Sequence, residues 1–432
     1  MKSMLSMKKA SVLVLFSLLC LLLLAGCGGV KIGNQTVDAD ATAVSVTDAS
    51  FDDYAVLKKL TKLSELDLRA LSLSVGQYEQ IASQVADDVR IFWNVPLGEE
   101  QYPNTSQSLQ LSSSQLSQAV EVLPYFTDLK TVTIEPCDLS EELCRAVEAV
   151  RGQFPDAQVH AGSQIGGVTF DDETEKVVLN KIKLADSDVI RLAIRAFPNI
   201  KTYEMCECGL SDDVMGKLRE DYPEITFIWV VKFDRFSVRT DAVVFSSLEY
   251  DVYRNITEET FQPLFRYCTE LRALDIGHHG IKDITGLANL KKLQALILTD
   301  NYISDISPLA QLPELRYIEI NWNDIADVTP FTQIENIENI SMSSNHHLKN
   351  ILNLTNCKNL KSLYLFGTNV KGKELDALIK GLPEGCIFQY DFNRHHNIRS
   401  ERRGRKVKEA FWDWEKVESF DFDTDSVYTM KK

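Results

Sequence analysis

A hydrophobic pattern that recurs every 22 residues constrains the fold of this chain more than any other feature. Five segments carry an apolar residue at their first, fourth and sixth positions, and they begin at Leu271, Leu293, Leu315, Ile337 and Leu360. The first four starts are 22 residues apart and the last follows after 23. A unit this short cannot bury its apolar face alone and must stack on its neighbours. The pattern therefore predicts a solenoid.

Asparagine recurs at one position of these coils. Asn301, Asn323 and Asn345 each follow the first apolar residue of a coil by eight positions. The form Asn-x-Ile-x-Asp-Ile-x-Pro-Leu at 301–309 resembles the internalin-like class of bacterial leucine-rich repeats, and the close resemblance covers 271–382. Leucine-rich repeats place asparagine or cysteine there because the buried side chain donates to backbone carbonyls that the turn leaves open. The resemblance implies an α/β solenoid, a horseshoe or arc with a parallel sheet on its concave face.

Weaker copies of the pattern occur earlier in the chain. They begin at Leu63, Leu129 and Ile200, at intervals of 66, 71 and 71 residues up to Leu271. Each copy has an apolar leader segment upstream, as at Val44. Because the leader segments and the leucine segments recur together at similar intervals, we predict a duplicated unit of two coils.

The earlier copies differ from the later ones in their outer segments and at the asparagine position. Residues 140–153 and 211–221 have helical spacing after a serine N-cap, whereas the later coils have short turns that contain proline. Cys137 and Cys208 occupy the asparagine position, so we expect both to point inward. We expect Cys206 on the open face, which argues against a metal or redox pair with Cys208.

These patterns predict five segments. We expect a signal peptide over 1–26, a lipidated tether over 27–41, degenerate two-coil repeats over 42–270, regular repeats over 271–390 and a C-terminal cap or tail over 391–432. The last segment has seven Lys or Arg and one acidic residue between Arg394 and Lys408. It closes the solenoid as a cap, contacts anionic cell-wall polymer or lipid as a basic arm, or forms a solvated linker.

The N-terminus carries an export signal. Lysines precede an apolar run from Ser11 to Leu24, which is too short for a spanning helix of about 20 apolar residues. The ending Leu24-Ala25-Gly26-Cys27 resembles the lipobox of bacterial lipoproteins. That resemblance implies lipidation of Cys27 and anchoring to the outer face of the bacterial cell membrane. The alternative is an ordinary secretory signal that ends in cysteine.

The charge of the chain excludes one class of partner. The formal net charge is −16, and it becomes −19 when residues 1–26, with three lysines and no acid, are removed. An acidic protein is a poor ligand for nucleic acid, whose phosphates require a basic surface. We therefore expect no nucleic-acid partner, and membrane affinity only through the lipid anchor.

The sequence offers little catalytic chemistry. It has no phosphate-binding loop, no nucleophile elbow and no zinc-binding helix motif. The histidine pairs at 278–279 and 346–347 lie three coils apart, on the order of 14 Å, which is too far for one metal. His279 occupies the asparagine position and is expected to be a hydrogen-bonding core residue. We predict no enzyme activity, no cofactor, no metal site and no catalytic residue.

The predicted binding surface is the concave strand face, where side chains alternate outward. Its members are Asp275, Ile297, Tyr317, Glu319, Asn321, Trp322, Tyr364 and Phe366. Exposed aromatic residues with polar neighbours are typical of interaction surfaces. The alternative is that the C-terminal tail covers them through Phe411 or Trp412.

These observations predict a non-enzymatic protein of the cell surface. We expect its concave face to bind another surface or secreted protein or peptide. The alternative function is binding of cell-wall glycan, in which Trp322 and Tyr317 stack on sugar rings.

Overall fold

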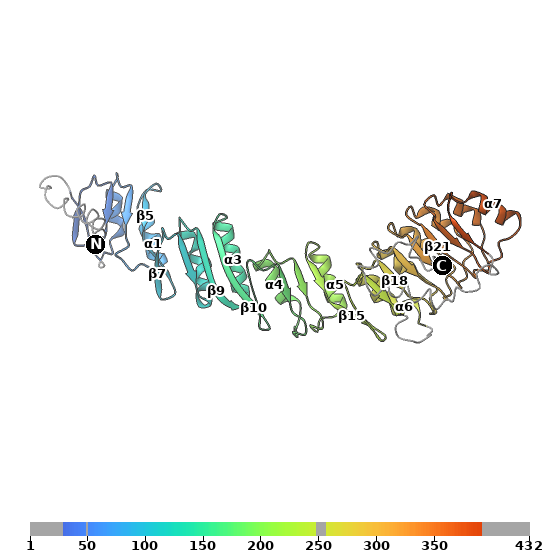
Figure 1. Ribbon diagram of the computed structural model, residues 1–432. Coiled ribbons are helices and arrows are strands. Elements are labelled where there is room, and N and C mark those ends of the chain that lie inside the picture. Colours follow the sequence, from blue (N-terminus) through green and yellow to red (C-terminus); the bar gives the residue numbers. More distant parts are fainter. Residues whose placement is uncertain (1–28, 49–50, 248–255, 391–432) are drawn as a thin grey trace, which may run out of the picture. The chain divides into compact units, whose positions relative to one another are not determined.

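A computed structural model describes residues 29–48, 51–247 and 256–390 of the chain (Figure 1). The predicted signal peptide, the predicted lipidation site Cys27 and the basic C-terminal segment lie outside these residues. The described chain divides into two compact units. The first comprises residues up to 175 together with 188–200, and the second comprises 176–187 together with the residues from 201 onward.

The regular repeats of the second unit form one continuous parallel sheet of seven strands in chain order. The strands are β17 (Val244–Ser246), β18 (Ala273–Asp275), β19 (Ala295–Ile297), β20 (Tyr317–Glu319), β21 (Asn339–Ser341), β22 (Ser362–Tyr364) and β23 (Ile387–Gln389). The central residue of each strand from β18 to β22 points into the core, and these five side chains, Leu274, Leu296, Ile318, Ile340 and Leu363, are fully buried. The leucine-rich repeat solenoid is confirmed in this region.

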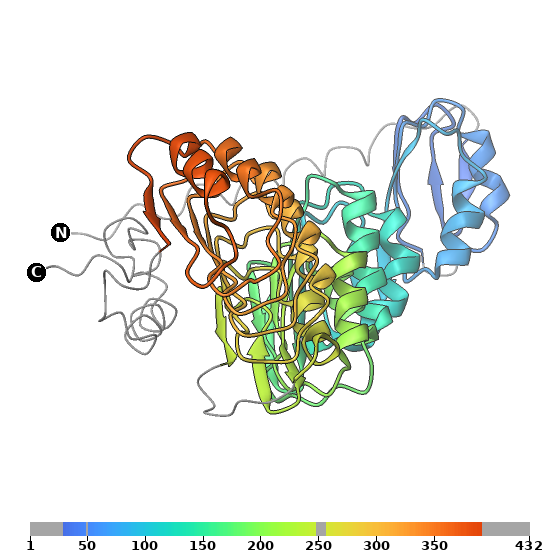
Figure 2. The ribbon, with the colours of Figure 1, turned by 90° about the vertical axis from the view of Figure 1, so that its right-hand side faces the viewer.

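The return segments of these coils are short helical turns, which Figure 2 shows as one continuous row. They are α6 (Glu258–Tyr267), η5 (Thr285–Asn289), η6 (Ser307–Gln311), η7 (Thr329–Gln333), η8 (Ile351–Asn356) and α7 (Lys373–Gly381). Pro308 and Pro330 stand in the first turn of η6 and η7, where a missing amide donor costs nothing. The prolines predicted tight convex turns at these positions. In the structure these turns are 3₁₀-helices.

Buried asparagines join each of these coils to its neighbour. The Asn323 amide donates to the carbonyl of Leu298 in the preceding coil at 3.0 Å and to Ile320 in its own coil at 3.3 Å. Its oxygen accepts from the Ile303 amide at 2.9 Å. Asn301 and Asn345 make the equivalent bonds. The expected role of the asparagine position is confirmed.

The earlier repeats have three parallel strands each, one more than the two-coil expectation. The strands are β3 (Ala43–Ser45), β4 (Glu65–Asp67) and β5 (Arg90–Phe92), then β8 (Ser108–Leu111), β9 (Thr131–Asp138) and β10 (Gln158–Ile165), then β12 (Lys176–Val178), β13 (Thr202–Glu204) and β14 (Thr226–Ile228). Each third strand leads into an antiparallel hairpin. The hairpins are β6 (Asn94–Leu97) with β7 (Glu100–Pro103), the end of β10 with β11 (Val168–Asp171), and β15 (Val230–Phe233) with β16 (Phe236–Arg239).

Helices form the outer layer of these earlier repeats. They are α1 (Val75–Ala82), α2 (Leu116–Val122), α3 (Glu141–Gln153), α4 (Asp188–Ala196) and α5 (Asp212–Asp221), with 3₁₀ turns η1 (Tyr54–Lys59), η2 (Ser113–Gln115) and η3 (Leu123–Tyr125). A short hairpin, β1 (Val30–Ile32) with β2 (Gln35–Val37), precedes them. Ser140 and Ser211 cap α3 and α5 as the sequence predicted.

One boundary of the predicted segments can be compared with the sheets. The residue-270 boundary falls inside the seven-stranded sheet, between β17 and β18. The division of the chain into five segments otherwise stays a prediction. No helix among the described residues is long and apolar enough to cross a membrane.

Candidate functional site

Five of the predicted binding residues, Asp275, Ile297, Tyr317, Glu319 and Tyr364, lie in two rows across the face of β18–β22, and Asn321, Trp322 and Phe366 follow the strands. Tyr317 stands in register between Ala295 and Asn339, and Glu319 stands between Ile297 and Ser341. The exposure that we expected for this face is wrong for most of it. The exposed fractions are 8% for Ile297, 4% for Tyr317 and 2% for Tyr364, and Phe366 is half-buried. The alternative, that residues 391–432 cover the face, lies outside the described residues.

Polar residues of this face are buried and held by hydrogen bonds. The Asp275 carboxylate accepts from the Ser246 hydroxyl at 3.0 Å and from the Gly277 amide at 3.2 Å. Burial raises the pKa of Asp275 to about 6, and the nearby negative charge of Glu319 adds to that shift. The Tyr317 hydroxyl donates to Glu319. These bonds explain why the tyrosine lies along the sheet instead of projecting from it.

Asn321 is also held by its neighbours. Its side-chain oxygen accepts from the Ser341 hydroxyl at 2.9 Å and from the Ser343 amide at 2.7 Å. The residue is 6% exposed. Its amide oxygen thus connects two adjacent coils, which is a structural role. Its part in partner binding stays a prediction.

Trp322 differs from the other predicted residues because its side chain is 63% exposed. It follows β20 at a position where the chain turns with a left-handed backbone, and its φ is +54°. The equivalent residues of neighbouring coils are His278, Asp300, Ser344 and Gly367, with φ between +59° and +63°. The amide of Trp322 donates to the Ser343 carbonyl of the next coil at 2.9 Å, which fixes the turn.

Tyr302 is an exposed aromatic residue that the sequence reasoning missed. Its side chain is 55% exposed. It lies two residues after Asp300, just as Asp324 lies two residues after Trp322 in the next coil. The signal was available, because Tyr302 and Asp324 each follow the buried asparagine of their coil directly, at equivalent positions of the repeat. We call the set Asp300, Tyr302, Trp322 and Asp324 the edge patch.

Backbone hydrogen bonds fix the register of the edge patch. The Asp300 amide donates to Asn321 in the next coil at 2.8 Å, and the Asp324 amide donates to Ile303 in the preceding coil at 2.9 Å. Trp322 therefore lies beside Asp300, and Asp324 beside Tyr302, on coils about 4.8 Å apart. The two aromatic rings occupy one diagonal of the patch and the two carboxylates the other.

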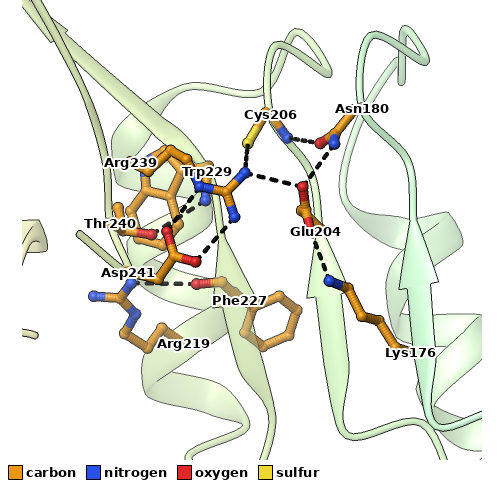
Figure 3. Close-up of polar contacts among 10 residues, drawn as sticks. All are labelled: Lys176, Asn180, Glu204, Cys206, Arg219, Phe227, Trp229, Arg239, Thr240 and Asp241. Atoms are coloured by element: carbon orange, nitrogen blue, oxygen red, sulfur yellow. Dashed lines mark hydrogen bonds and ion pairs between the residues drawn. The ribbon is translucent and has the colours of Figure 1, made fainter. Parts of the chain in front are cut away.

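A separate cluster of charges lies on the β12–β14 sheet (Figure 3). Glu204 pairs with Lys176 at 2.7 Å and with Arg239 at 2.9 Å, and it accepts from Asn180 at 2.8 Å. These hydrogen bonds, with that of Lys176 the strongest, lower the pKa of Glu204 to about 2. Arg239 also pairs with Asp241 at 2.9 Å. Every carboxylate of the cluster is matched by a base, so it is a structural network.

The cysteines are placed differently from the prediction at two positions. Cys206 is buried, with 9% exposure, because the Arg239 guanidinium lies over it and donates to its sulfur at 3.6 Å. We had expected it on the open face. Cys137 is half-buried near the end of β9 and does not point fully inward. Cys208 is 2% exposed, as expected.

The histidines of the described residues do not form a metal site. His279 is buried and bonds the Ser247 hydroxyl at 2.8 Å, which confirms its predicted core role. His278 pairs with Asp300 at 2.9 Å. Within residues 29–48, 51–247 and 256–390, no group of three or more His, Cys, Asp or Glu side chains is placed to hold a metal ion.

No family model and no curated protein matches this sequence. Several solved structures align with it. An internalin from Listeria monocytogenes is 19% identical over 50% of this chain and 80% of its own, with a TM-score of 0.29. A second internalin from that organism is 15% identical over 79% and 73%, with a TM-score of 0.26. A leucine-rich repeat protein from Leptospira interrogans is 13% identical over 80% and 93%, with a TM-score of 0.28. At these scores the fold rests on the strand register and the asparagine ladder of the chain itself.

Proposed function

We propose that this chain is an exported, lipid-anchored protein of the bacterial cell surface that binds another protein and has no enzymatic activity. Binding takes place on the concave face of β18–β22 and at the edge patch that adjoins it. The observation that carries the proposal is Trp322, a tryptophan that is 63% exposed on a rigid coil. Tryptophan dominates binding hot spots in protein interfaces.

Within the part of the chain that the structure describes, no hydrogen bond or ring contact requires a tryptophan at position 322. A left-handed backbone costs a bulky side chain roughly 1–2 kcal/mol, and glycine, asparagine or aspartate would avoid most of that cost. The exposed indole also buries little apolar area in return. Two unfavourable local features at one residue indicate that the side chain serves something outside the chain.

The scaffold around Trp322 favours recognition. The coil is held on both sides by the buried Asn323 and Asn345, so the ring starts from a fixed backbone position. A rigid aromatic anchor loses little conformational entropy when it binds. The neighbouring residues Asp275, Tyr317 and Glu319 of the face of β18–β22 are buried, so Trp322 offers a ligand far more exposed surface than they do.

The lipid anchor is supported by the sequence around Cys27. A Cys27→Ala variant removes the proposed acylation site. We expect this variant to leave the membrane fraction and appear in the soluble fraction or the medium. A variant that still fractionates entirely with membranes would disprove the anchor without affecting the binding proposal.

Cell-wall glycan is the second candidate ligand, because an exposed indole stacks on sugar rings as readily as on protein. Tyr317 is 4% exposed and cannot be the second platform as we first expected. Tyr302, in the coil next to Trp322, takes that place. The edge patch therefore offers a glycan two exposed aromatic rings for stacking.

Capture from surface extracts separates the two ligands. The wild-type protein is compared with Trp322→Asn, which removes the ring and suits the left-handed backbone. Leu352→Asn on η8 is the matched control, since Leu352 is 42% exposed outside the edge patch. We expect the wild type and Leu352→Asn to capture a ligand that Trp322→Asn loses.

The treatment that abolishes capture identifies the ligand class. A protein ligand disappears after protease treatment of the extract, and a glycan ligand after muralytic treatment. Capture that persists undiminished in Trp322→Asn would contradict the proposed site.

A further inference from the structure

The edge patch has a composition that favours one kind of ligand. Its rings, Trp322 and Tyr302, are 63% and 55% exposed. Its carboxylates, Asp300 and Asp324, are also exposed. In the backbone register each ring-bearing residue has one aspartate beside it on the adjacent coil and the other two residues away on its own coil.

The surrounding loops are strongly negative. The stretches 299–308 and 321–330 together contain four aspartates and neither lysine nor arginine. Two of these aspartates, Asp305 and Asp327, accept from the amides of Ser307 at 2.8 Å and Thr329 at 3.0 Å. The hydrogen bonds of Thr329 lower the pKa of Asp327, so this carboxylate is ionised at neutral pH.

One histidine lies at the border of the edge patch. His278 pairs with Asp300 at 2.9 Å when it is protonated. The Asp324 carboxylate has no ion-pair partner among the described residues of the chain. The carboxylate of the edge patch that remains available to a ligand is therefore that of Asp324, beside Tyr302.

We propose that the edge patch binds a lysine- or arginine-bearing segment of the protein partner, with a cationic side chain over the Trp322 ring and flanked by Asp324. A cation within about 6 Å of an indole face is attracted by the ring quadrupole, and tryptophan is the strongest of the aromatic residues in this role. A neighbouring carboxylate adds an ion pair to the same group.

The negative charge of the surrounding loops favours a basic segment over a neutral sugar. A neutral sugar would use the rings and gain nothing from four surrounding aspartates. A basic segment uses both the rings and the charge. This inference rests on the proposed protein-binding function and names the chemistry of its partner. The basic stretch 394–408 of this chain is a competing occupant, and a second copy of the protein supplies the same stretch.

The test titrates hexalysine, and separately a hexamer of N-acetylglucosamine, into the full-length protein and its variants. Trp322→Asn leaves the net charge unchanged, so it separates the ring from non-specific attraction to an acidic protein. Asp324→Asn removes the open carboxylate, and Leu352→Asn is the control outside the patch. Tyr302→Ser is a second ring variant at a residue without positive φ, in case the first disturbs the fold.

We expect hexalysine to bind the wild type, with a Kd weakened about fivefold by Trp322→Asn and about threefold by Asp324→Asn. Leu352→Asn should leave the Kd unchanged.

Equal binding of hexalysine by the wild type and both ring variants would overturn the inference, as would ring-dependent binding of the sugar alone. Hexalysine binding that appears only after deletion of 391–432 would assign the patch to the chain's own basic stretch and overturn it as a partner site. Protein capture with no hexalysine binding would leave the proposed function standing and reject this inference.

Discussion

The regular coils (residues 271–389) and the early repeats (residues 43–239) share one leucine pattern but end their sheets differently. In the regular coils a buried asparagine donates to the carbonyls of two coils, so each coil requires a similar coil before it. In the early repeats the third strand runs into an antiparallel hairpin. At both Trp93 and Trp229 the backbone amide is bound by a side chain of the far hairpin strand, Asn104 at 3.2 Å and Thr240 at 3.1 Å.

This difference explains the two sheet lengths. The asparagine ladder passes hydrogen bonds from coil to coil through Asn301, Asn323 and Asn345, in the middle of the sheet of seven strands, and leaves each side open to a further coil. The hairpin replaces the strand that a further coil would supply, which limits the parallel part of each early sheet to three strands. The ladder therefore builds a long uniform surface, and the hairpin divides the chain into modules.

The two regions also use the left-handed position differently. Glu207 of the early repeats has φ +59° and pairs with Lys232 at 2.7 Å. Trp322 has φ +54° and is exposed. The same backbone turn thus carries a surface ion pair in one region and an exposed aromatic ring in the other. This difference is the reason why we propose that the regular coils carry the binding function.

The largest expected effect comes from breaking the ladder. Asn323→Ala removes the donor to Leu298 and leaves the Ile303 amide buried without its acceptor. We expect a loss of about 3 kcal/mol in the free energy of unfolding. Thr368, at the same position, makes one bond within its own coil, so Thr368→Ala should cost about 1 kcal/mol. Urea denaturation measures both, and equal losses would contradict the ladder.

The hydrogen bond that closes the hairpin at Thr240 should contribute less to the free energy of unfolding than the asparagine ladder does. Thr240→Val keeps the shape of the side chain and leaves the buried Trp229 amide without its hydroxyl acceptor. We expect a loss of about 2 kcal/mol, while Thr240→Ser, which keeps the hydroxyl, should lose less than half of that. If the two variants are equally stable in urea, the hydrogen bond does not close the hairpin.

The two regions should respond to pH with opposite sign. The pKa of Glu204 is lowered to about 2, so its ion pairs stabilise the fold above about pH 4.5 and are lost as the pH falls toward 2. The pKa of Asp275 is raised to about 6, so its protonated form stabilises the fold below about pH 4 and that contribution is lost as the pH rises through 6.

Substitutions test these two opposite pH dependences when the free energy of unfolding is measured between pH 3 and pH 8. Glu204→Gln should lower stability most at pH 7 and less at pH 3, where part of the contribution of the ion pairs is already lost. Asp275→Asn should raise stability relative to the wild type above pH 6 and lose that advantage near pH 4. The same pH dependence in both variants would show that the two carboxylates do not differ in environment.

The smallest expected effect is at the edge patch. Trp322→Asn removes an exposed side chain from a left-handed residue, so we expect the stability to stay the same or rise by up to about 1 kcal/mol. Thermal melts of the variant and of Leu352→Asn provide the comparison. A loss above 1 kcal/mol would mean that the indole supports the fold and is not free to serve a ligand.

The regular coils could be predicted from sequence because their strands, asparagines and prolines follow a fixed spacing. Asn323 and His279 are buried hydrogen bonders as expected. The third strand of the early repeats was missed, since 89–93 and 225–229 repeat only with each other and not with the leucine pattern. Pairing with a hairpin is a long-range property that the spacing of leucines does not encode.

The binding face could be predicted only in outline. Alternation on a strand gives the direction of a side chain but not what lies over it, so Tyr317 was expected to be exposed and is buried. Trp322 was predicted for its residue type, and its left-handed backbone became visible only in the structure. Tyr302 lies outside the strand, where alternation was not applied.

Hydroxyl-radical footprinting with surface extract tests most directly whether binding belongs to the regular coils. The account predicts that oxidation of Trp322 and Tyr302 falls when the extract is added, while oxidation of Leu352 and of residues 43–239 stays constant. Protection confined to 43–239, or unchanged oxidation of both aromatic residues beside a captured ligand, would contradict it.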